Sequence, residues 1–413
     1  MEKRKLIVLP GNICSPFFVN EIPYLKKYFE DIYVLSFSSE KEGKEILDKY
    51  ELNGEFREKL RVNIHYLTEL FCWLQEDYVK HEVKNVVSLS KQGVRKLVYI
   101  FLYGYYYIMS KDLITEQINN SQGEVYIYSY WLSRAGFCIA NIDRKQYPNI
   151  KRIFSRAHGY DIYFERNSSG YLPFRQYIED RLDRIYFISE DGMEYFTSRV
   201  SVHNNSKYKA KKKVARLGTY NNNKLVKTII DKQEIVIASC SSIIQLKRLD
   251  LIIDVIQYAS EKGINVKWIH IGSGELEKEI KKQANMKLEK KQAIFLGNVD
   301  NKKVLETYIK YDVDFFINMS DTEGIPVSVM EALSGGIPVI ARNVGGLQEI
   351  ISEDCGLLIN DPTVNEYDKI IDFLLIREKD KEKYQSKSNA AYYKWDTEYN
   401  AEKNYTQFME DIL

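Results

Sequence analysis

The most constraining feature of this sequence is a regular alternation of short apolar runs with segments of helical length. In the first half the predicted strands are Lys5 to Pro10, Tyr33 to Phe37, Val62 to Tyr66, Glu124 to Ser129, Arg152 to Arg156 and Arg184 to Ser189. In the second half they are Glu234 to Cys240, Asn265 to Gly272, Ala293 to Gly297, Val313 to Asn318 and Pro338 to Ala341. Strands separated by helices predict a mostly parallel α/β sheet, whose ligands bind at the carboxyl ends of the strands.

A chain of 413 residues is long for one domain and natural for two. The composition shifts at the basic run SKYKAKKKVAR (206–216), which is followed by a cluster of asparagines at 221–223. This shift indicates a domain boundary. The basic run itself is expected to be a solvated face, with contact to an anionic lipid surface as the alternative.

Charge and cysteine content exclude several classes of protein. The 59 Lys and Arg residues nearly cancel the 58 Asp and Glu residues, so no general attraction to nucleic acid is indicated. The five cysteines form no Cys-x-x-Cys pair, which argues against a disulfide framework or a zinc ribbon and for a reduced, cytoplasmic protein. The uncharged stretch Leu97 to Ser110 is shorter than the roughly 20 residues of a membrane span, and is expected to be a buried or interfacial helix.

The stretch Asp314 to Ile350 carries the strongest chemical signal. A buried strand ends in a loop containing Glu323, and a helix is predicted to start at Pro326. The free N–H groups and the positive end of such a helix favour an anion. Glu331 lies little more than one turn into the helix, so two carboxylates flank this anion site. A nucleotide sugar, which is both anionic and rich in hydroxyl groups, is a ligand of this kind.

The pattern E-G-x-P-x-x-x-x-E-A-x-x-x-G-x-P-V-I-A resembles the signature of retaining GT-B glycosyltransferases of family four. It is formed here by Glu323, Gly324, Pro326, Glu331, Ala332, Gly336, Pro338, Val339, Ile340 and Ala341. The resemblance implies two Rossmann-like, doubly wound domains that face a cleft. Residues 1–216 would bind the acceptor, residues 217–390 would bind the nucleotide sugar, and residues 391–413 would cross back to the first domain.

The implied reaction is transfer of a hexosyl unit from a nucleotide diphosphate sugar to a glycan or lipid-linked saccharide, with the anomeric configuration retained. Surface polysaccharide biosynthesis, in the cytoplasm or at the inner face of the membrane, is the implied setting, and no cofactor or metal is expected. The resemblance assigns catalytic roles to Glu323 and His158. It assigns donor binding to Lys247, Arg248, Ser242, Gly324, Ile325, Pro326, Val327, Glu331 and Val299.

A few further positions are weaker candidates. RIFSRAHGYDIYFER places Arg156 and Asp161 beside His158, and the first loop offers Gly11 and Asn12. The turn WIHIGSGEL contains Gly272. Asp312 and Asp314 spell D-x-D, which in another glycosyltransferase fold would suggest a metal. Here the pattern precedes the apolar run of a strand, at the end opposite to the ligand, and predicts no metal.

Two other readings stay open from the sequence. A sugar-nucleotide epimerase or a glycan phosphorylase could use the same architecture, and the phosphorylase would commonly carry a lysine-bound pyridoxal phosphate. A non-catalytic glycan-binding subunit is the other alternative, against which the set of Glu323, Glu331, Lys247 and His158 argues.

Overall fold

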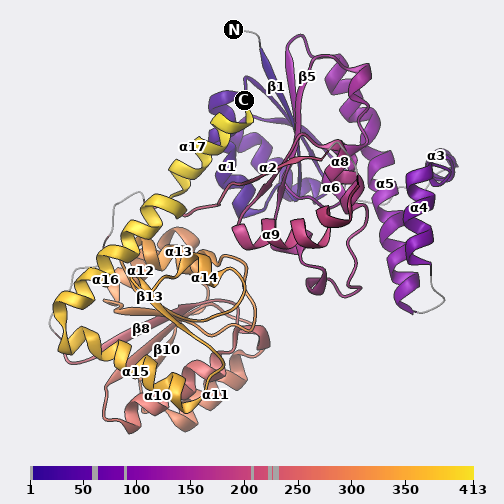
Figure 1. The fold of residues 1–413 in the computed structure, drawn as a ribbon. Coiled ribbons are helices and arrows are strands. Elements are labelled where there is room, and N and C mark those ends of the chain that lie inside the picture. Colours follow the sequence, from indigo (N-terminus) through magenta and orange to yellow (C-terminus); the bar gives the residue numbers. More distant parts are fainter. Residues whose placement is uncertain (1–2, 58–63, 88–90, 206–208, 222–225, 227–231) are drawn as a thin grey trace. The chain divides into compact units, whose positions relative to one another are not determined.

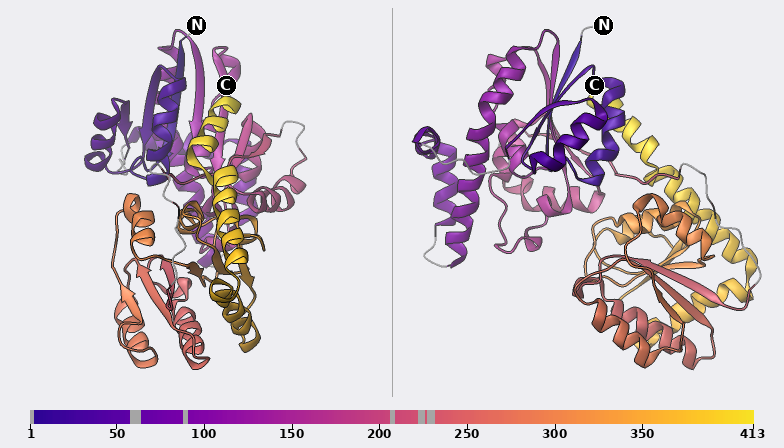
Figure 2. Two further views of the ribbon diagram at one scale, coloured as in Figure 1. Left: turned by 90° about the vertical axis from the view of Figure 1, so that its left-hand side faces the viewer. Right: turned by 180° about the vertical axis from the view of Figure 1, so that it is seen from behind.

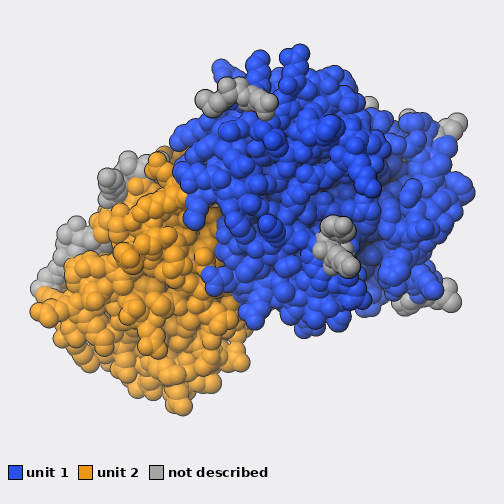
Figure 3. Space-filling view, turned by 45° about the horizontal axis from the view of Figure 1, so that its top comes forward, with its two compact units in different colours: residues 1–215, 405–413 blue, residues 216–404 orange. Residues whose placement is uncertain are grey.

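A computed structural model describes residues 3–57, 64–87, 91–205, 209–221, 226 and 232–413. The chain divides into two compact units, which Figure 3 colours separately. Unit 1 comprises Met1–Ala215 and Tyr405–Leu413, and unit 2 comprises Arg216–Asn404. The boundary after Ala215 lies at the end of the basic run, before its last residue Arg216, and the last residues of the chain return to the first unit.

Unit 1 is built on a parallel sheet with strand order β3-β2-β1-β4-β5-β6-β7. Its strands are β1 (Arg4–Gly11), β2 (Asp31–Ser36), β3 (Asn53–Phe56), β4 (Glu124–Ser129), β5 (Ile150–Ala157), β6 (Arg184–Phe187) and β7 (Lys211–Val214). Its α-helices are α1 (Pro16–Tyr28), α2 (Glu40–Tyr50), α3 (Ile64–Leu74), α4 (Asp77–Val86), α5 (Lys91–Asn119), α6 (Arg134–Ala140), α7 (Gly159–Ile162), α8 (Arg175–Arg181) and α9 (Glu190–Arg199). Helices cover both faces of the sheet (Figure 1).

Successive side chains of a strand point to opposite sides of the sheet. Because helices cover both sides of this sheet, the central strands of unit 1 are buried on both faces. Ile7 and Leu9 of β1 pack in the core beneath α5 and α6. On the other face, Phe408 of α17 (Ala401–Ile412) lies 4.9 Å from the ring of Tyr186. The carboxyl-terminal segment is thus part of the core of unit 1.

Unit 2 contains a second parallel sheet, with strand order β10-β9-β8-β11-β12-β13. Its strands are β8 (Ile235–Cys240), β9 (Val266–Ile271), β10 (Ala293–Phe295), β11 (Phe315–Asn318), β12 (Val339–Arg342) and β13 (Gly356–Ile359). Its α-helices are α10 (Leu249–Glu261), α11 (Glu277–Lys287), α12 (Asn301–Lys310), α13 (Val327–Ser334), α14 (Leu347–Ile350), α15 (Val364–Lys379) and α16 (Lys381–Lys394), followed by a π-helical turn, Trp395–Tyr399. Figure 2 shows helices on both faces of this sheet.

In each sheet the chain order reverses once, between β1 and β4 in unit 1 and between β8 and β11 in unit 2. A doubly wound sheet binds its ligands outside the carboxyl ends of the strands at such a reversal. The predicted α/β class with two Rossmann-like, doubly wound sheets is therefore confirmed. The reversals direct attention to the loops after β1 and β4, and to those after β8 and β11.

The predicted strand Val62 to Tyr66 is wrong. Residues 62 and 63 lie outside the described residues, and α3 begins at Ile64. The alternation of apolar residues continues as Leu67, Leu70 and Phe71, which is helical spacing, so tertiary packing resolves the ambiguity in favour of a helix. The strand at this sheet edge is β3, whose Gly54 approaches β2 so closely that an added Cβ would lie 2.4 Å from the carbonyl oxygen of Val34.

Candidate functional site

The loop after β11 holds a carboxylate between three hydrogen-bond donors. Glu323 is only 8% exposed. Its Oε1 atom accepts from Lys247 Nζ at 2.6 Å, from the Ser320 hydroxyl at 2.7 Å and from Asn318 Nδ2 at 3.2 Å. These bonds fix the side chain without any ligand. The structure thus brings two of the predicted residues, Lys247 and Glu323, into direct contact.

Lys247 reaches this place from the short 3-10 turn that precedes α10. The backbone N–H of Asp321 donates to the carbonyl of Leu246 at 2.9 Å, which ties the loop after β8 to the loop after β11. The neighbouring Arg248, in a left-handed conformation with φ 49°, pairs with Asp250 at 2.9 Å and with Asp321 at 3.2 Å. Arg248 therefore braces the loop, whereas the charge of Lys247 faces Glu323.

The start of α13 completes this group of elements. Pro326 caps the helix, so the helix begins one residue later than the sequence predicts. Gly345 has a φ of 53°, and an added Cβ there would lie 2.0 Å from the carbonyl oxygen of Glu323. Only glycine permits this approach, which packs the loop before α14 against the loop before α13. The positions predicted to bind the donor at this helix start are all partly buried: Gly324, Ile325, Pro326 and Val327.

Glu331, on the first turns of α13, is in a different electrostatic state from Glu323. Burial raises the pKa of its carboxyl group to about 8. No ion-pair partner for it occurs among the described residues, and it lies close enough to Cys240 to help raise the pKa of that thiol. Glu331 is therefore largely protonated at neutral pH, and a protonated carboxyl can both donate to and accept from a hydroxyl group.

We expect Glu331→Gln to remove a pH dependence of stability. The folded-state pKa of Glu331 lies above its unfolded value, so its favourable contribution is complete below about pH 4.5 and is lost as the pH rises towards 8. The slope is at most about 1.4 kcal/mol per pH unit. Urea unfolding of unit 2 between pH 5 and 8 should show a flatter profile for Glu331→Gln than for the wild type. The exposed Glu353→Gln is the control, and identical slopes for all three proteins would contradict the expectation.

In unit 1, the carboxyl ends of β1, β4 and β5 bring together Gly11, Trp131 and His158. The Trp131 ring lies 4.3 Å from the His158 ring, and an added Cβ on Gly11 would lie 3.4 Å from Trp131. His158 is 5% exposed, and its Nε2 atom lies 3.0 Å from the carbonyl oxygen of Tyr130. A carbonyl only accepts, so Nε2 carries the proton and Nδ1 is the accepting nitrogen. Burial, and secondarily Arg156, lowers the pKa of His158 to about 3, so its ring is neutral.

Arg156 does not share this edge, because its guanidinium is fully buried within unit 1. Nε lies 3.1 Å from the Glu21 carboxylate and 3.1 Å from the Tyr128 hydroxyl, and Nη1 donates to the carbonyl of Ala215 at 2.8 Å. The guanidinium carbon is 3.8 Å from the ring centroid of Phe408. These contacts give Arg156 a structural role that joins α1, β4 and α17 to the segment that follows β7.

Asp161 and Asn12 shape the loops beside this edge. The Asp161 carboxylate accepts from the N–H groups of Leu132 at 3.2 Å and His158 at 3.3 Å, and burial raises its pKa to about 6. Asn12 accepts from the N–H of Cys14 at 2.9 Å. Both side chains therefore hold backbone in place.

The remaining predicted positions lie at the carboxyl ends of β8 to β10. Gly272 has a φ of 132°, and an added Cβ would lie 1.9 Å from the carbonyl oxygen of Ser241, so glycine allows the two loops to touch. Ser242 is exposed on the loop that leads to Lys247, and Val299 is partly buried in the loop after β10. Neither has a contact to Lys247 or Glu323 among those that the structure records.

Sequence reasoning missed Arg342 and Trp131. Arg342 ends β12, is 9% exposed, and pairs with Asp321 and, at 2.8 Å, with Asp361. A basic residue at the carboxyl end of a predicted strand was the signal for Arg342. No comparable signal marked Trp131, which follows β4. Its contact is with His158, which follows the neighbouring strand β5 and is distant in the sequence.

The D-x-D pattern lies at the other end of β11 and is neutralised by cations. Asp314 is 1% exposed, accepts from the N–H of Val236 at 2.8 Å and pairs with Arg377 at 2.8 Å and Lys232 at 3.1 Å. Asp312 pairs with Lys232 at 2.5 Å. Across the part of the chain that the structure describes, no group of three or more His, Cys, Asp or Glu side chains is arranged to hold a metal ion.

Comparison with known proteins agrees with this architecture. Residues 221–392 match the family model described as glycosyl transferases group 1. Over 129 residues the chain is 34% identical to the O-antigen biosynthesis glycosyltransferase WbnH of Escherichia coli. The aligned residues make up 30% of this chain and 34% of WbnH. Over 78 residues it is 35% identical to the sulfoquinovosyl transferase SQD2 of Arabidopsis thaliana, covering 18% and 15% of the two chains. The match thus spans about a third of the length of WbnH and less of SQD2.

Solved structures resemble the chain over its whole length. Anabaena HepE in complex with UDP and glucose has a TM-score of 0.62 at 15% identity, covering 100% of this chain and 99% of that one. The apo form of the lipopolysaccharide outer core galactosyltransferase WaaB has a TM-score of 0.65 at 13% identity, covering 99% and 98%. The fold is therefore GT-B, and residues 221–392 within it match the group 1 glycosyl transferase model.

Proposed function

We propose that this protein is a retaining glycosyltransferase of family four that transfers a hexosyl unit from a nucleotide diphosphate sugar to a glycan or lipid-linked saccharide in surface polysaccharide biosynthesis. The observation that carries the proposal is the contact of Lys247 with Glu323 beside the start of α13. This contact lies at the carboxyl ends of β8 and β11, where the chain order of unit 2 reverses.

Unit 2 binds the donor in this proposal. Lys247 and the N–H groups that begin α13 bind the diphosphate, because a mobile ammonium and a helix N-terminus both favour phosphate. Glu331 binds the ribose hydroxyls, and Glu323 contacts the sugar. The loop containing Ser242 lies beside the diphosphate, and the loop containing Val299 lies beside the base.

These residues act by stabilising the negative charge of the leaving group. The bond between the anomeric carbon and the diphosphate breaks, and negative charge develops on the leaving phosphate. Donors that are already oriented stabilise that charge without reorganisation, and such a contribution is usually the largest single term in catalysis. The hydrogen bonds from Ser320 and Asn318 keep the Glu323 carboxylate in position while Lys247 interacts with the phosphate.

Unit 1 contributes the acceptor side and His158. A neutral imidazole with its Nε2 proton committed to Tyr130 cannot act as a general acid at neutral pH, but it can accept a hydrogen bond at Nδ1. We therefore assign His158 to orienting the transferred sugar.

His158→Ala is expected to lower kcat by about threefold to tenfold, since one hydrogen bond between neutral groups is lost. The KM for the donor should change little, because the residue acts on the sugar and not on the nucleotide. Steady-state kinetics with the donor varied at saturating acceptor measure both values, and the exposed His203→Ala is the matched control. A kcat equal to that of the wild type would remove His158 from the reaction.

A panel of nucleotide diphosphate sugars, each offered with and without saccharide acceptors, tests the proposed function. Nucleotide release that requires acceptor, together with a product whose anomeric configuration equals that of the donor by NMR, supports it. A new nucleotide sugar formed without acceptor would identify an epimerase. No release with any donor, combined with saccharide binding, would identify a non-catalytic subunit.

The same assay includes a metal-stripped arm with excess chelator. We propose that activity persists there, because Lys232 and Arg377 already neutralise Asp312 and Asp314. Activity that is lost and then restored by magnesium or manganese would overturn metal independence, and a matching loss in Asp312→Asn with Asp314→Asn would place the metal at that pattern.

We also propose that the protein works at the inner face of the cytoplasmic membrane, through α3 and α5. None of the helices within the described residues is long and apolar enough to cross a membrane. Exposed apolar side chains follow one stripe of each helix: Leu67 and Phe71 on α3, and Val94, Val98 and Phe101 on α5. Between Lys91 and Lys111 the sequence of α5 holds only basic charges, which favours an anionic lipid surface.

The basic run between the domains is less available for that contact. Lys212 pairs with Glu179 at 2.7 Å, Lys213 pairs with Asp411, and Lys209 donates to the carbonyl of Ser201 at 2.8 Å. We therefore expect the double change Phe71→Glu and Val98→Glu to abolish sedimentation with phosphatidylglycerol vesicles, while Val202→Glu, an exposed apolar position elsewhere, leaves it unchanged. Equal sedimentation of all three proteins would contradict the assignment to α3 and α5.

A further inference from the structure

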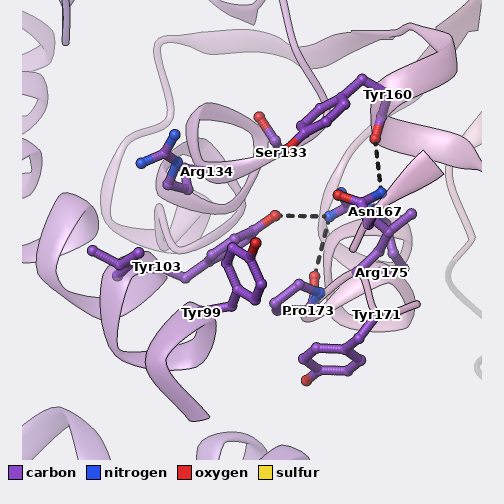
Figure 4. A pocket seen from close by; sticks show the side chains of 11 residues that line it. Tyr99, Tyr103, Ser133, Arg134, Tyr160, Asn167, Tyr171, Pro173 and Arg175 are labelled. Atoms are coloured by element: carbon purple, nitrogen blue, oxygen red, sulfur yellow. Dashed lines mark hydrogen bonds between the residues drawn. The ribbon is translucent and has the colours of Figure 1, made fainter. Parts of the chain in front are cut away.

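Unit 1 contains a pocket that none of the roles above uses. Its volume is about 160 Å³, and it lies between α5, the start of α6 and the segment that leads into α8 (Figure 4). Tyrosine rings form much of its wall: Tyr99 and Tyr103 from α5, Tyr160 from α7, and Tyr171 from the segment before α8. Because tyrosine combines a flat apolar face with a polar tip, such a wall suits a ligand that has both kinds of surface.

Arg175 supplies a buried positive charge to this pocket. It is 4% exposed, and its Nε atom donates to the carbonyl of Asp161 at 3.0 Å. Nη1 donates to the carbonyl of Pro173 at 3.1 Å and to the Tyr103 hydroxyl at 3.4 Å, and Figure 4 shows both bonds inside the pocket wall. Its partners are thus neutral oxygens, and among the described residues no carboxylate forms an ion pair with Arg175.

One donor of Arg175 is left over. Nη2 is buried and has no hydrogen-bond partner among the described residues. Leaving a charged donor buried and unsatisfied is costly, so this atom calls for an explanation. The nearby Asp161 carboxylate forms no hydrogen bond or ion pair with it: Oδ2 accepts from the N–H groups of Leu132 and His158, and Oδ1 is buried without a hydrogen-bond partner in the described part of the chain. Arg175 is nevertheless close enough to oppose the rise that burial causes in the pKa of Asp161.

A second arginine stands at the exposed side of the same pocket. Arg134, at the start of α6, is exposed, and its guanidinium carbon lies 4.5 Å from the ring centroid of Tyr106, which holds the side chain against α5. None of the described residues that line the pocket is acidic. Two guanidinium groups without a lining carboxylate favour an anion, and the planar fork of arginine matches a carboxylate or a phosphate.

We propose that this pocket binds an acidic sugar unit of the acceptor, with its carboxylate or phosphate at Arg134 and Arg175 and its ring against the tyrosines. The volume of about 160 Å³ is below the roughly 300 to 1,000 Å³ of sites that enclose a drug-sized ligand, so one sugar unit is the appropriate size. The assignment of this sugar to the acceptor rests on the proposed function, whereas the anion preference rests on the pocket alone.

Titration calorimetry on the full chain with methyl glucuronide, glucose 6-phosphate and neutral methyl glucoside tests the inference. At least one anionic sugar should bind about tenfold or more tightly than the neutral one, and the preferred anion decides between a uronic acid and a sugar phosphate. Arg134→Ala should remove that preference, since this exposed side chain contributes charge and not core packing. Arg199→Ala, an exposed arginine stacked on Tyr195, is the matched control and should keep it.

Equal affinity for the charged and neutral sugars, or an unchanged preference in Arg134→Ala, would overturn the inference. Arg175→Lys adds a second variant, which keeps the charge and loses the fork, and it should weaken binding of the anion without changing binding of methyl glucoside. A parallel titration with UDP and GDP separates the two proposals. Nucleotide binding without an anion preference would leave only the proposed function standing, and an Arg134-dependent preference without nucleotide binding would leave only the pocket.

Discussion

Replacing Lys247 with alanine is expected to lower kcat/KM for the donor by about 10- to 150-fold, the equivalent of the roughly 1.5 to 3 kcal/mol of a charge-assisted hydrogen bond. The affinity for a nucleoside diphosphate should fall together with turnover, because the contact is made to the leaving group in the ground state and strengthens as charge develops. Lys247→Arg should recover part of the loss, since it retains the charge with a different geometry.

The contact of Lys247 with Glu323 offers a competing explanation, in which the lysine acts only by holding the carboxylate. Glu323 keeps its bonds from Ser320 and Asn318 when Lys247 is removed, so this second effect should be small. Calorimetric titration with UDP and GDP separates the two explanations, because only loss of the diphosphate contact weakens nucleotide binding. Lys287→Ala, which removes an exposed lysine paired with Asp254 at 2.5 Å, is the control. Wild-type nucleotide affinity in Lys247→Ala would refute the assignment.

The parts of the fold that sequence predicts well are those whose burial is uniform. The strand predicted over Glu124 to Ser129 is β4, residue for residue, because every side chain from Val125 onwards is buried and apolar character marks the whole run. The edge strands β3 and β7 were not predicted, because their side chains are only partly buried. β3 is NGEF and β7 is KKKV, and an edge strand that is half solvated needs little apolar character.

The candidate site shows a similar division. Glu323, Pro326 and Glu331 are positioned by one local element, a strand followed by a loop and a helix, so their spacing in the sequence is enough to place them together. The partners Trp131 and Arg342, and the pocket around Arg175, depend on contacts between segments far apart in the chain. Arg175 and Tyr103, for example, are 72 positions apart. No local pattern specifies which distant side chain completes such a group.

Arg156 illustrates how a candidate binding residue can prove to be structural, and its removal is expected to have the largest effect on stability. Arg156→Ala leaves the Glu21 carboxylate buried without its cation, and breaking a buried ion pair in this way costs about 3 to 5 kcal/mol. The carbonyl of Ala215 and the ring of Phe408 lose their partner as well. Since burial already raises the pKa of Glu21, the variant should lose more stability at high pH than at low pH, because protonation of the carboxyl at low pH removes the unpaired buried charge.

Hydrogen exchange resolves this effect within the two-unit chain. Amides of β5 in unit 1 should lose protection in Arg156→Ala, whereas amides of β9 in unit 2 should keep it and serve as an internal control. The double variant Arg156→Met with Glu21→Gln removes both charges and retains most of the volume, so it should be more stable than Arg156→Ala alone. If β5 kept wild-type protection in Arg156→Ala while activity fell, the guanidinium would be acting on a ligand and not on the core. Loss of protection in β5 with rescue by the double variant would establish that Arg156 holds α1, β5 and α17 together through its pairing with Glu21.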